Sequence, residues 1–191
     1  MQMRHIASAG LLLFVLGVFF GFAAVSLLAE PGKECARCMD GTVETVFSPG
    51  AEEEVLGLIR GANESIEVEM YLFNYMPLAN ELVKAKERGV DVRVILEPRL
   101  SGDENLKMMK FLREKGISAR WASLEYKLTH AKAMIVDKKK VLVGSTNWSM
   151  SAMTKNREYS VLIEDNGVVA EFIKNFEEDW EKATNPNSEG E

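Results

Sequence analysis

A histidine and a lysine two positions apart, His130 and Lys132, open an apolar segment of the chain. Side chains at positions i and i+2 of a strand project from the same face of a sheet, so an imidazole and an ammonium group would lie side by side. A second apolar segment, 141–143, runs into the glycine turn Gly144-Ser145-Thr146-Asn147. Four residues join the two segments, and a hairpin of that length returns the glycine turn to His130. Ser145 and Asn147 there add a hydroxyl and an amide.

The charge around these residues is opposite in sign to that of the whole chain. Residues 127–157 contain seven lysines and arginines and one acidic residue, whereas the 191-residue chain has a formal charge of −6. A confined positive region on an acidic protein suits a phosphate group, and the acidic total argues against a protein that coats nucleic acid. Lysines 138–140 are interpreted as a solvated turn.

The run from His130 to Asn147 has the spacing H-x-K-x4-D-x6-G-S-x-N. It resembles the HKD motif of the phospholipase D superfamily, with every position filled. The strand and helix before KERGVDVRVILE, the triplet Asn156-Arg157-Glu158 and the closing helix that ends in Trp180 resemble small, single-motif members of that family. These members include bacterial periplasmic endonucleases and membrane-anchored mitochondrial proteins. The resemblance covers residues 42–182.

The resemblance implies a reaction mechanism and a partner. The family pairs two HKD motifs: one histidine forms a phosphohistidine and the other protonates the leaving group. This chain has one motif, and its second histidine, His5, lies at the start of the chain. We therefore expect a two-fold homodimer that shares one active site. No metal ion and no other cofactor is implied.

The motif residues receive separate expected roles. Lys132 and Asn147 would hold the non-bridging phosphate oxygens, because attack on phosphorus requires that negative charge to be neutralised. Glu158 resembles the family carboxylate that bonds the motif histidine, and Ser145 resembles a residue that supports the phosphate. Asp137 completes the motif and is counted with the catalytic set. Its opposite parity on the strand turns it away from the histidine, which indicates a structural role.

Two interpretations stay open for the neighbouring side chains. Tyr71 and Asn74 either line the site or pack in the core, and Arg99 and Arg157 either touch substrate or lie on the surface. Trp148 is interpreted as a core or dimer contact rather than as a platform for a nucleic-acid base.

Competing hypotheses for the function differ in the substrate. A phosphodiesterase that acts as an endonuclease on DNA or RNA is favoured by the small size and the single motif. The alternative is a phospholipase D that acts on membrane phospholipids. A binding module without turnover is disfavoured because His130, Lys132, Asn147 and Glu158 are all present. A basic groove across two chains would indicate the nuclease, and an apolar rim beside the site would indicate the lipase.

The first 29 residues are predicted to be a membrane anchor. Residues 6–29 contain no charged side chain, and as a helix they reach about 36 Å, which is enough to span a bilayer. This length favours an uncleaved signal anchor over a cleaved signal peptide. Arg4 before the run and Glu30 after it place the N-terminus in the cytoplasm. We expect a single-pass protein of the cell membrane with an extracytoplasmic catalytic domain.

The remaining chain is predicted to contain one α/β domain, a layered α/β/α sandwich with a mixed β-sheet. Residues 30–41 form a linker in which Cys35 and Cys38 are free, disulfide-bonded or zinc-binding, residues 42–183 form the catalytic domain, and residues 184–191 form a flexible tail. Strands are expected at 42–47, 65–73, 90–96, 117–121, 131–136, 141–143 and 159–163, and helices at 52–60, 77–88, 103–115 and 168–182. Ser48 is a candidate cap for the first of these helices.

Overall fold

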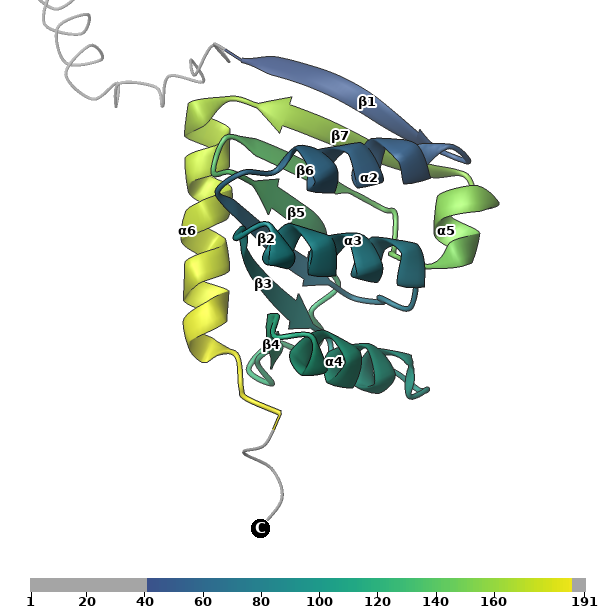
Figure 1. Cartoon of the computed structure of the whole chain (residues 1–191), viewed down its shortest axis with the longest axis vertical. Helices are drawn as coiled ribbons and strands as arrows, with labels where there is room; N and C mark the ends of the chain where they lie inside the picture. The colour runs from purple at the N-terminus through teal and green to yellow at the C-terminus, as the bar shows by residue number, and fades with distance from the viewer. Residues whose placement is uncertain (1–40, 187–191) are drawn as a thin grey trace, which may run out of the picture. The chain divides into compact units, whose positions relative to one another are not determined.

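Seven strands form one mixed sheet in the computed structural model, which describes residues 41–186 (Figure 1). The strands are β1 (Thr42–Ser48), β2 (Ser65–Met70), β3 (Asp91–Leu96), β4 (Ser118–Trp121), β5 (Lys132–Val136), β6 (Lys140–Gly144) and β7 (Glu158–Glu164). Their order is β1-β7-β6-β5-β2-β3-β4. The β2–β3 and β3–β4 pairs are parallel and the other pairs are antiparallel, which confirms the predicted mixed sheet.

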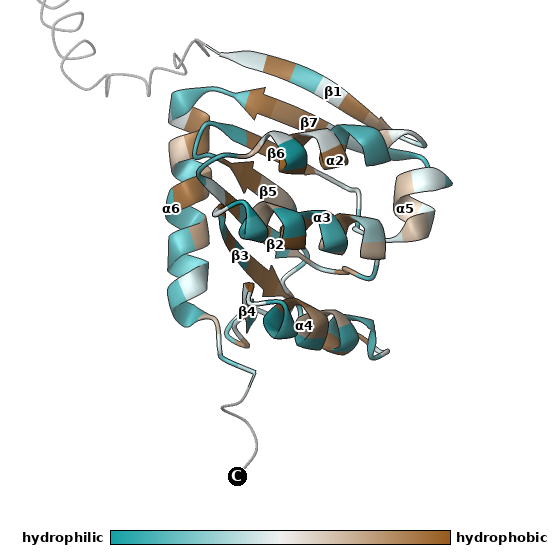
Figure 2. Cartoon of the chain, viewed as in Figure 1, coloured by the Kyte–Doolittle hydropathy of each residue, from teal (hydrophilic) through white to brown (hydrophobic). Residues whose placement is uncertain are grey.

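Helices cover both faces of the sheet. They are α2 (Ala51–Gly61), α3 (Met76–Glu87), α4 (Glu104–Glu114), α5 (Met150–Thr154) and α6 (Asn166–Lys182). The first four pack on one face in the larger hydrophobic core, whereas α6 packs on the other face through Val169 and Phe176. Figure 2 shows apolar strands between helices whose outer surfaces are hydrophilic. The layered sandwich follows from these two cores.

Local signals explain most of the helix boundaries. Pro77 lies in the first turn of α3, where its missing N–H is not needed. Gly89 and Gly116 follow α3 and α4 with φ of 94° and 78°, a backbone conformation that favours glycine. The Asp165 side chain accepts a hydrogen bond from the Val168 N–H at 2.9 Å and caps α6.

The predicted role of Ser48 as a helix cap is wrong. Gly50 is the residue before α2, and no side chain caps that helix. The Ser48 hydroxyl is fully buried and donates instead to the carbonyl oxygens of Ala152 and Met153, the latter at 2.9 Å. Ser48 therefore joins the end of β1 to α5, a five-residue helix that is too short to show a periodic apolar pattern.

The polar side of β2 is covered as well, although its alternating pattern predicts a half-buried strand. Glu67 is 3% exposed and its carboxylate lies 3.2 Å from the Arg93 guanidinium. Arg93 also pairs with Glu177 of α6 at 2.6 Å and lies over the Phe176 ring. Glu67 can be buried on this face because it is paired with Arg93.

Several predictions concern residues outside the described part of the chain. These are the anchor at 1–29, the linker with Cys35 and Cys38, and most of the tail. Within residues 41–186, every helix is too short or too polar to serve as a membrane span.

Candidate active site

The topology brings the motif residues to one end of the sheet. Lys132 begins β5 opposite Met70, the last residue of β2. Gly144 ends β6 opposite Ser160, near the start of β7. We call this the site end. The antiparallel hairpin that the sequence predicts therefore returns the glycine turn to the strand that follows His130.

His130 and Lys132 are adjacent, as predicted. The Lys132 Nζ donates a hydrogen bond to the His130 backbone carbonyl at 2.8 Å, and Lys132 is only 9% exposed. His130 is exposed, and its ring centre lies 4.5 Å from that of Tyr71. Burial lowers the pKa of Lys132, and the nearby Glu158 carboxylate partly offsets this effect. The site thus presents an accessible imidazole beside a fixed cation.

Glu158 and Ser145 form a second polar group at the same end. The Ser145 hydroxyl donates to the Glu158 carboxylate at 2.5 Å and accepts from the Tyr159 N–H at 3.1 Å. The Asn156 amide donates to the other Glu158 oxygen at 3.1 Å. Within residues 41–186, these bonds replace the expected one between Glu158 and His130. Each Glu158 oxygen thus accepts one bond, from Ser145 or from Asn156.

The glycine turn is closely packed. A Cβ atom on Gly144 would lie 2.2 Å from the Tyr159 carbonyl oxygen, so this position accepts glycine alone. Asn147 is half-buried, and its Oδ1 has no hydrogen-bond partner among the described residues. A buried amide oxygen without a partner is unfavourable. The Asn147 amide oxygen is therefore an unsatisfied acceptor within the described residues.

Asp137 lies at the opposite end of β5. Its carboxylate accepts backbone N–H bonds from Asn63, Glu64 and Ser65 at 2.7–3.1 Å. Burial alone would raise the pKa of Asp137, but these bonds outweigh burial and lower it. Asp137 also begins the hairpin turn with a φ of 53°. The geometry agrees with a structural role and separates Asp137 from the other motif residues.

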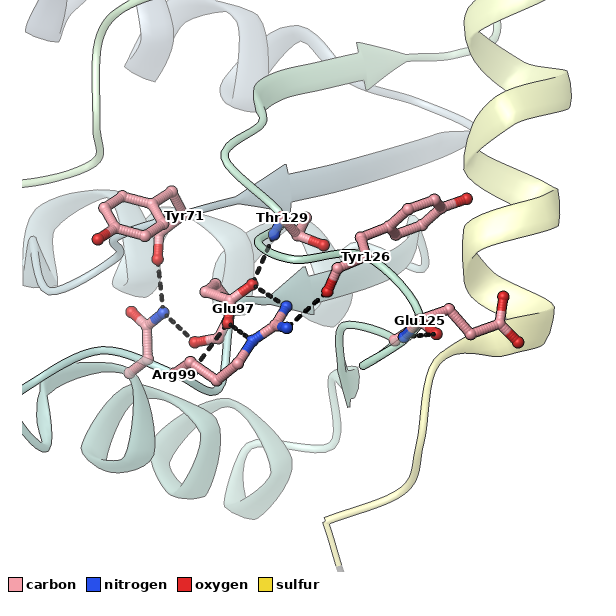
Figure 3. Close-up of polar contacts among 8 residues, drawn as sticks. Tyr71, Glu97, Arg99, Glu125, Tyr126 and Thr129 are labelled. Atoms are coloured by element: carbon pink, nitrogen blue, oxygen red, sulfur yellow. Dashed lines mark hydrogen bonds and ion pairs between the residues drawn. The ribbon is translucent and has the colours of Figure 1, made fainter.

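A buried carboxylate that was not predicted, Glu97, holds the loop leading to His130 (Figure 3). Glu97 is fully buried just after β3 and accepts the Thr129 N–H at 2.7 Å. The Arg99 Nε donates to it at 2.6 Å, and the Arg99 Nη1 donates to the Tyr126 carbonyl at 2.6 Å. Burial would raise the pKa of Glu97, but the bonds from Arg99 and Thr129 lower it overall. The sequence feature that points to Glu97 is its position as a charged residue at the end of the apolar segment VRVILE.

Asn105 of α4 extends this network toward the site. Its amide donates to the Glu97 carbonyl at 2.9 Å and to the Tyr71 carbonyl at 2.7 Å. The backbone of Tyr71 in turn donates to the Ala131 carbonyl at 2.8 Å. The residues flanking His130 are thus fixed to the ends of β2 and β3.

Some of the neighbouring side chains are buried or paired within the chain, and others are exposed. Trp148 is buried and packs edge-on against Phe73, with ring centres 4.8 Å apart, so it is a core residue. Arg99 is engaged with Glu97, whereas Arg157 and Asn74 are exposed. In the described range, no cluster of three His, Cys, Asp or Glu side chains could hold a metal ion.

Comparison with known proteins places this site in a family. Residues 55–180 match the family described as "Cardiolipin synthase, PLD-like domain". The chain is 31% identical over 163 residues to the human mitochondrial cardiolipin hydrolase, with 82% of this chain and 62% of that protein covered. It is 31% identical over 136 residues to the phospholipase D of Rickettsia prowazekii, covering 70% of this chain and 65% of that protein. The chain therefore spans less than two thirds of either relative.

Solved structures show the same relationship. The phospholipase D family member Nuc from Salmonella typhimurium superposes with a TM-score of 0.70 at 31% identity, covering 75% of this chain and 97% of that one. NucT from Helicobacter pylori shares the fold, with a TM-score of 0.67 at 19% identity. The spacing from His130 to Asn147, the family match over residues 55–180 and the shared fold lead to one conclusion: the chain belongs to the phospholipase D family.

Proposed function

We propose that the chain hydrolyses phosphodiesters by covalent catalysis at His130. An imidazole nitrogen attacks phosphorus, and a P–N bond forms as the bond to the leaving alkoxide breaks. Water then attacks the phosphohistidine, the P–N bond breaks, and the imidazole is restored. The observation that carries this proposal is the exposed His130 imidazole beside the fixed Lys132 ammonium.

Lys132 and Asn147 supply charge neutralisation in this mechanism. A lysine ammonium has three N–H donors, and one of those of Lys132 bonds the His130 carbonyl, which leaves two for phosphate oxygens. The Asn147 amide adds a neutral donor. Such groups, held in place before reaction, stabilise the charge that develops on the phosphoryl oxygens.

The reaction also requires a proton donor for the leaving alkoxide. His130 is the sole histidine of residues 41–186, since the other one is His5. We propose that a second copy of the chain supplies this proton from its own histidine, in a two-fold homodimer with one shared site.

Phospholipids are the substrate that the surface around the site favours. Leu124, Tyr126 and Leu128 are 60%, 43% and 40% exposed on the loop that leads to His130. An apolar rim of this kind is the feature expected of a lipase, and it supports a phospholipid substrate over the nucleic-acid substrate that the small size and single motif favoured. The curated relatives described above are named for phospholipid hydrolysis. We place the catalytic domain outside the cytoplasm, held to the cell membrane by residues 6–29.

Nucleic acid is the second candidate. Lys127, Lys155 and Arg157 are exposed cations near the motif in sequence, and two copies would double their number. Lysines and arginines of this kind bind a phosphate backbone.

The test uses the full chain, with His130→Asn as the control, in the presence of EDTA. It is incubated with mixed phospholipid vesicles, single-stranded DNA, duplex DNA and RNA. We expect headgroup release from the vesicles by the unsubstituted chain alone. Cleavage of nucleic acid with intact lipid would assign the second function, and equal activity of the His130→Asn variant would refute the mechanism.

A further inference from the structure

Four large apolar side chains are exposed beside the site. We define the apolar rim as Leu106, Leu124, Tyr126 and Leu128, which are 47%, 60%, 43% and 40% exposed. We propose that the apolar rim docks the catalytic domain onto an uncharged, zwitterionic phospholipid surface, with the site end facing the lipid. This proposal rests on the phospholipid substrate proposed above and adds how the domain reaches it.

The rim is built at the site end by two segments. The loop 122–131 leaves the end of β4 and crosses the ends of β3 and β2 before it enters β5, because these strands are neighbours in that order. The first turn of α4 lies at the same end, since α4 follows β3. Figure 1 shows α4 beside β4 at one border of the sheet. Leu106 comes from α4, and the other three rim residues come from the loop that ends at His130.

A groove between the two segments continues the apolar surface. It has a volume of about 310 Å³ and is lined by Leu100, Leu106, Trp121 and Leu124, among others. The side chains of Leu106 and Leu124 therefore belong to one surface. Their exposure leaves apolar area in water that contact with acyl chains would remove.

The rim is held in shape before any contact with lipid. Glu97 bonds Thr129 and Arg99, and Arg99 bonds the Tyr126 carbonyl, so both segments are joined to one buried carboxylate (Figure 3). Tyr126 also packs against the Lys182 ammonium of α6 at 5.3 Å. A surface that is already ordered loses little conformational entropy when it docks.

The two segments that carry the rim are themselves nearly neutral, which favours an uncharged lipid surface. Segments 98–106 and 122–130 contain two basic and three acidic residues. Most are paired within the chain, as in Arg99 with Glu97, Asp103 with Lys107 and Glu125 with Lys182. These two segments therefore add little electrostatic attraction to an anionic membrane, and binding through their apolar area depends little on salt. Nucleic-acid binding, in contrast, weakens steeply with salt.

The position of the predicted anchor explains why a second contact with the membrane is useful. Twelve residues separate the predicted anchor, which ends at residue 29, from the start of β1, and such a segment reaches at most about 40 Å. β1 begins at Thr42 opposite Glu164, at the sheet end remote from Glu158. The predicted anchor would tether the domain, and the described chain begins β1 at the end of the sheet remote from the site. A second contact is needed to turn the site toward the lipid, and the rim supplies it.

The test places the full chain in phosphatidylcholine nanodiscs with and without brominated acyl chains, which quench nearby tryptophans. Leu124→Trp reports on the rim. Val43→Trp is the control, because Val43 is 49% exposed at the other end of the sheet and closer in sequence to the anchor. Relative to the unsubstituted chain, we expect quenching of the added tryptophan in Leu124→Trp and none in Val43→Trp. Equal quenching of both, or of neither, would overturn the proposal.

A second experiment separates docking from chemistry. Leu106→Asp and Leu124→Asp should each lower the rate on phosphatidylcholine vesicles by about tenfold, from the burial of one leucine. Hydrolysis of the soluble substrate bis(p-nitrophenyl) phosphate should not change. If the unsubstituted chain hydrolyses neither substrate, the proposed function fails, while the quenching still tests docking. Dissociation of the dimer by these substitutions would assign the rim to a second copy and overturn the docking surface.

Discussion

Replacing Glu97 by glutamine tests whether the buried carboxylate positions His130. Both oxygens accept bonds: one from the Thr129 N–H and the Arg99 Nη2, the other from the Arg99 N–H and Nε, all within 3.0 Å. An amide keeps one acceptor and turns the other into a donor, so two of the four bonds are lost. Hydrogen bonds to a charged group contribute about 1.5–3 kcal/mol each. Because Arg99 reaches solvent, we expect a loss of stability of about 2–3 kcal/mol.

The activity should fall as well. Without its bond to Glu97, Thr129 can move, and His130 moves with it. A displacement of about 1 Å costs roughly 100-fold in rate, so we expect kcat on a soluble phosphodiester to drop 10- to 100-fold. Urea unfolding and steady-state kinetics, at a temperature where the variant stays folded, measure the two effects.

Glu81→Gln is the matched control. Glu81 is also a buried carboxylate, and it pairs with Lys84 and Arg60 between α2 and α3. This variant should lose stability and keep its kcat. A Glu97→Gln enzyme with the kcat of the unsubstituted chain would refute the positioning role. The depressed pKa of Glu97 means that its stabilisation is present above its ordinary pKa of 4.5 and is lost as the pH falls through the lower folded value.

Other substitutions and conditions give separate tests. Burial raises the pKa of Glu69 to about 7, so the folded chain loses stability as the pH rises from 4.5 to 7. Glu69→Gln should remove this dependence and gain at most about 3 kcal/mol at pH 8; identical urea midpoints at pH 5 and pH 8 in the unsubstituted chain would contradict it. Asp137→Asn should cost about 1–2 kcal/mol in stability and leave kcat unchanged, whereas a loss of activity as complete as that of His130→Asn would return Asp137 to the catalytic set. EDTA should leave the rate unchanged, and strong inhibition would reveal a metal requirement.

The parts of the site that the sequence predicted depend on short-range geometry. His130 and Lys132 are neighbours on one segment, and a tight hairpin returns the glycine turn to them, so spacing alone brings them together. Asp137 could be separated from this group by its parity on the strand. Local sequence signals likewise explain why two helices end at Gly89 and Gly116, where the backbone has a positive φ.

The missed features depend on contacts between distant segments. Glu97 binds Thr129, 32 residues further along the chain, and Ser48 binds α5 more than 100 residues away. No periodicity encodes such partners. The expected bond between Glu158 and His130 is likewise replaced by bonds to Ser145 and Asn156. The exposure of Leu124 and Leu128 could not be foreseen either, because an alternation of apolar and polar residues in a loop does not reveal which side faces water.

The most direct test of covalent catalysis is to look for the intermediate itself. The full chain is mixed with phosphatidylcholine vesicles, quenched within one turnover and digested, and the peptide containing His130 is analysed by mass spectrometry. We expect a phosphatidyl adduct on His130 that is labile to acid and absent from His130→Asn. Turnover without an adduct on this peptide, or with the adduct on another residue, would contradict it.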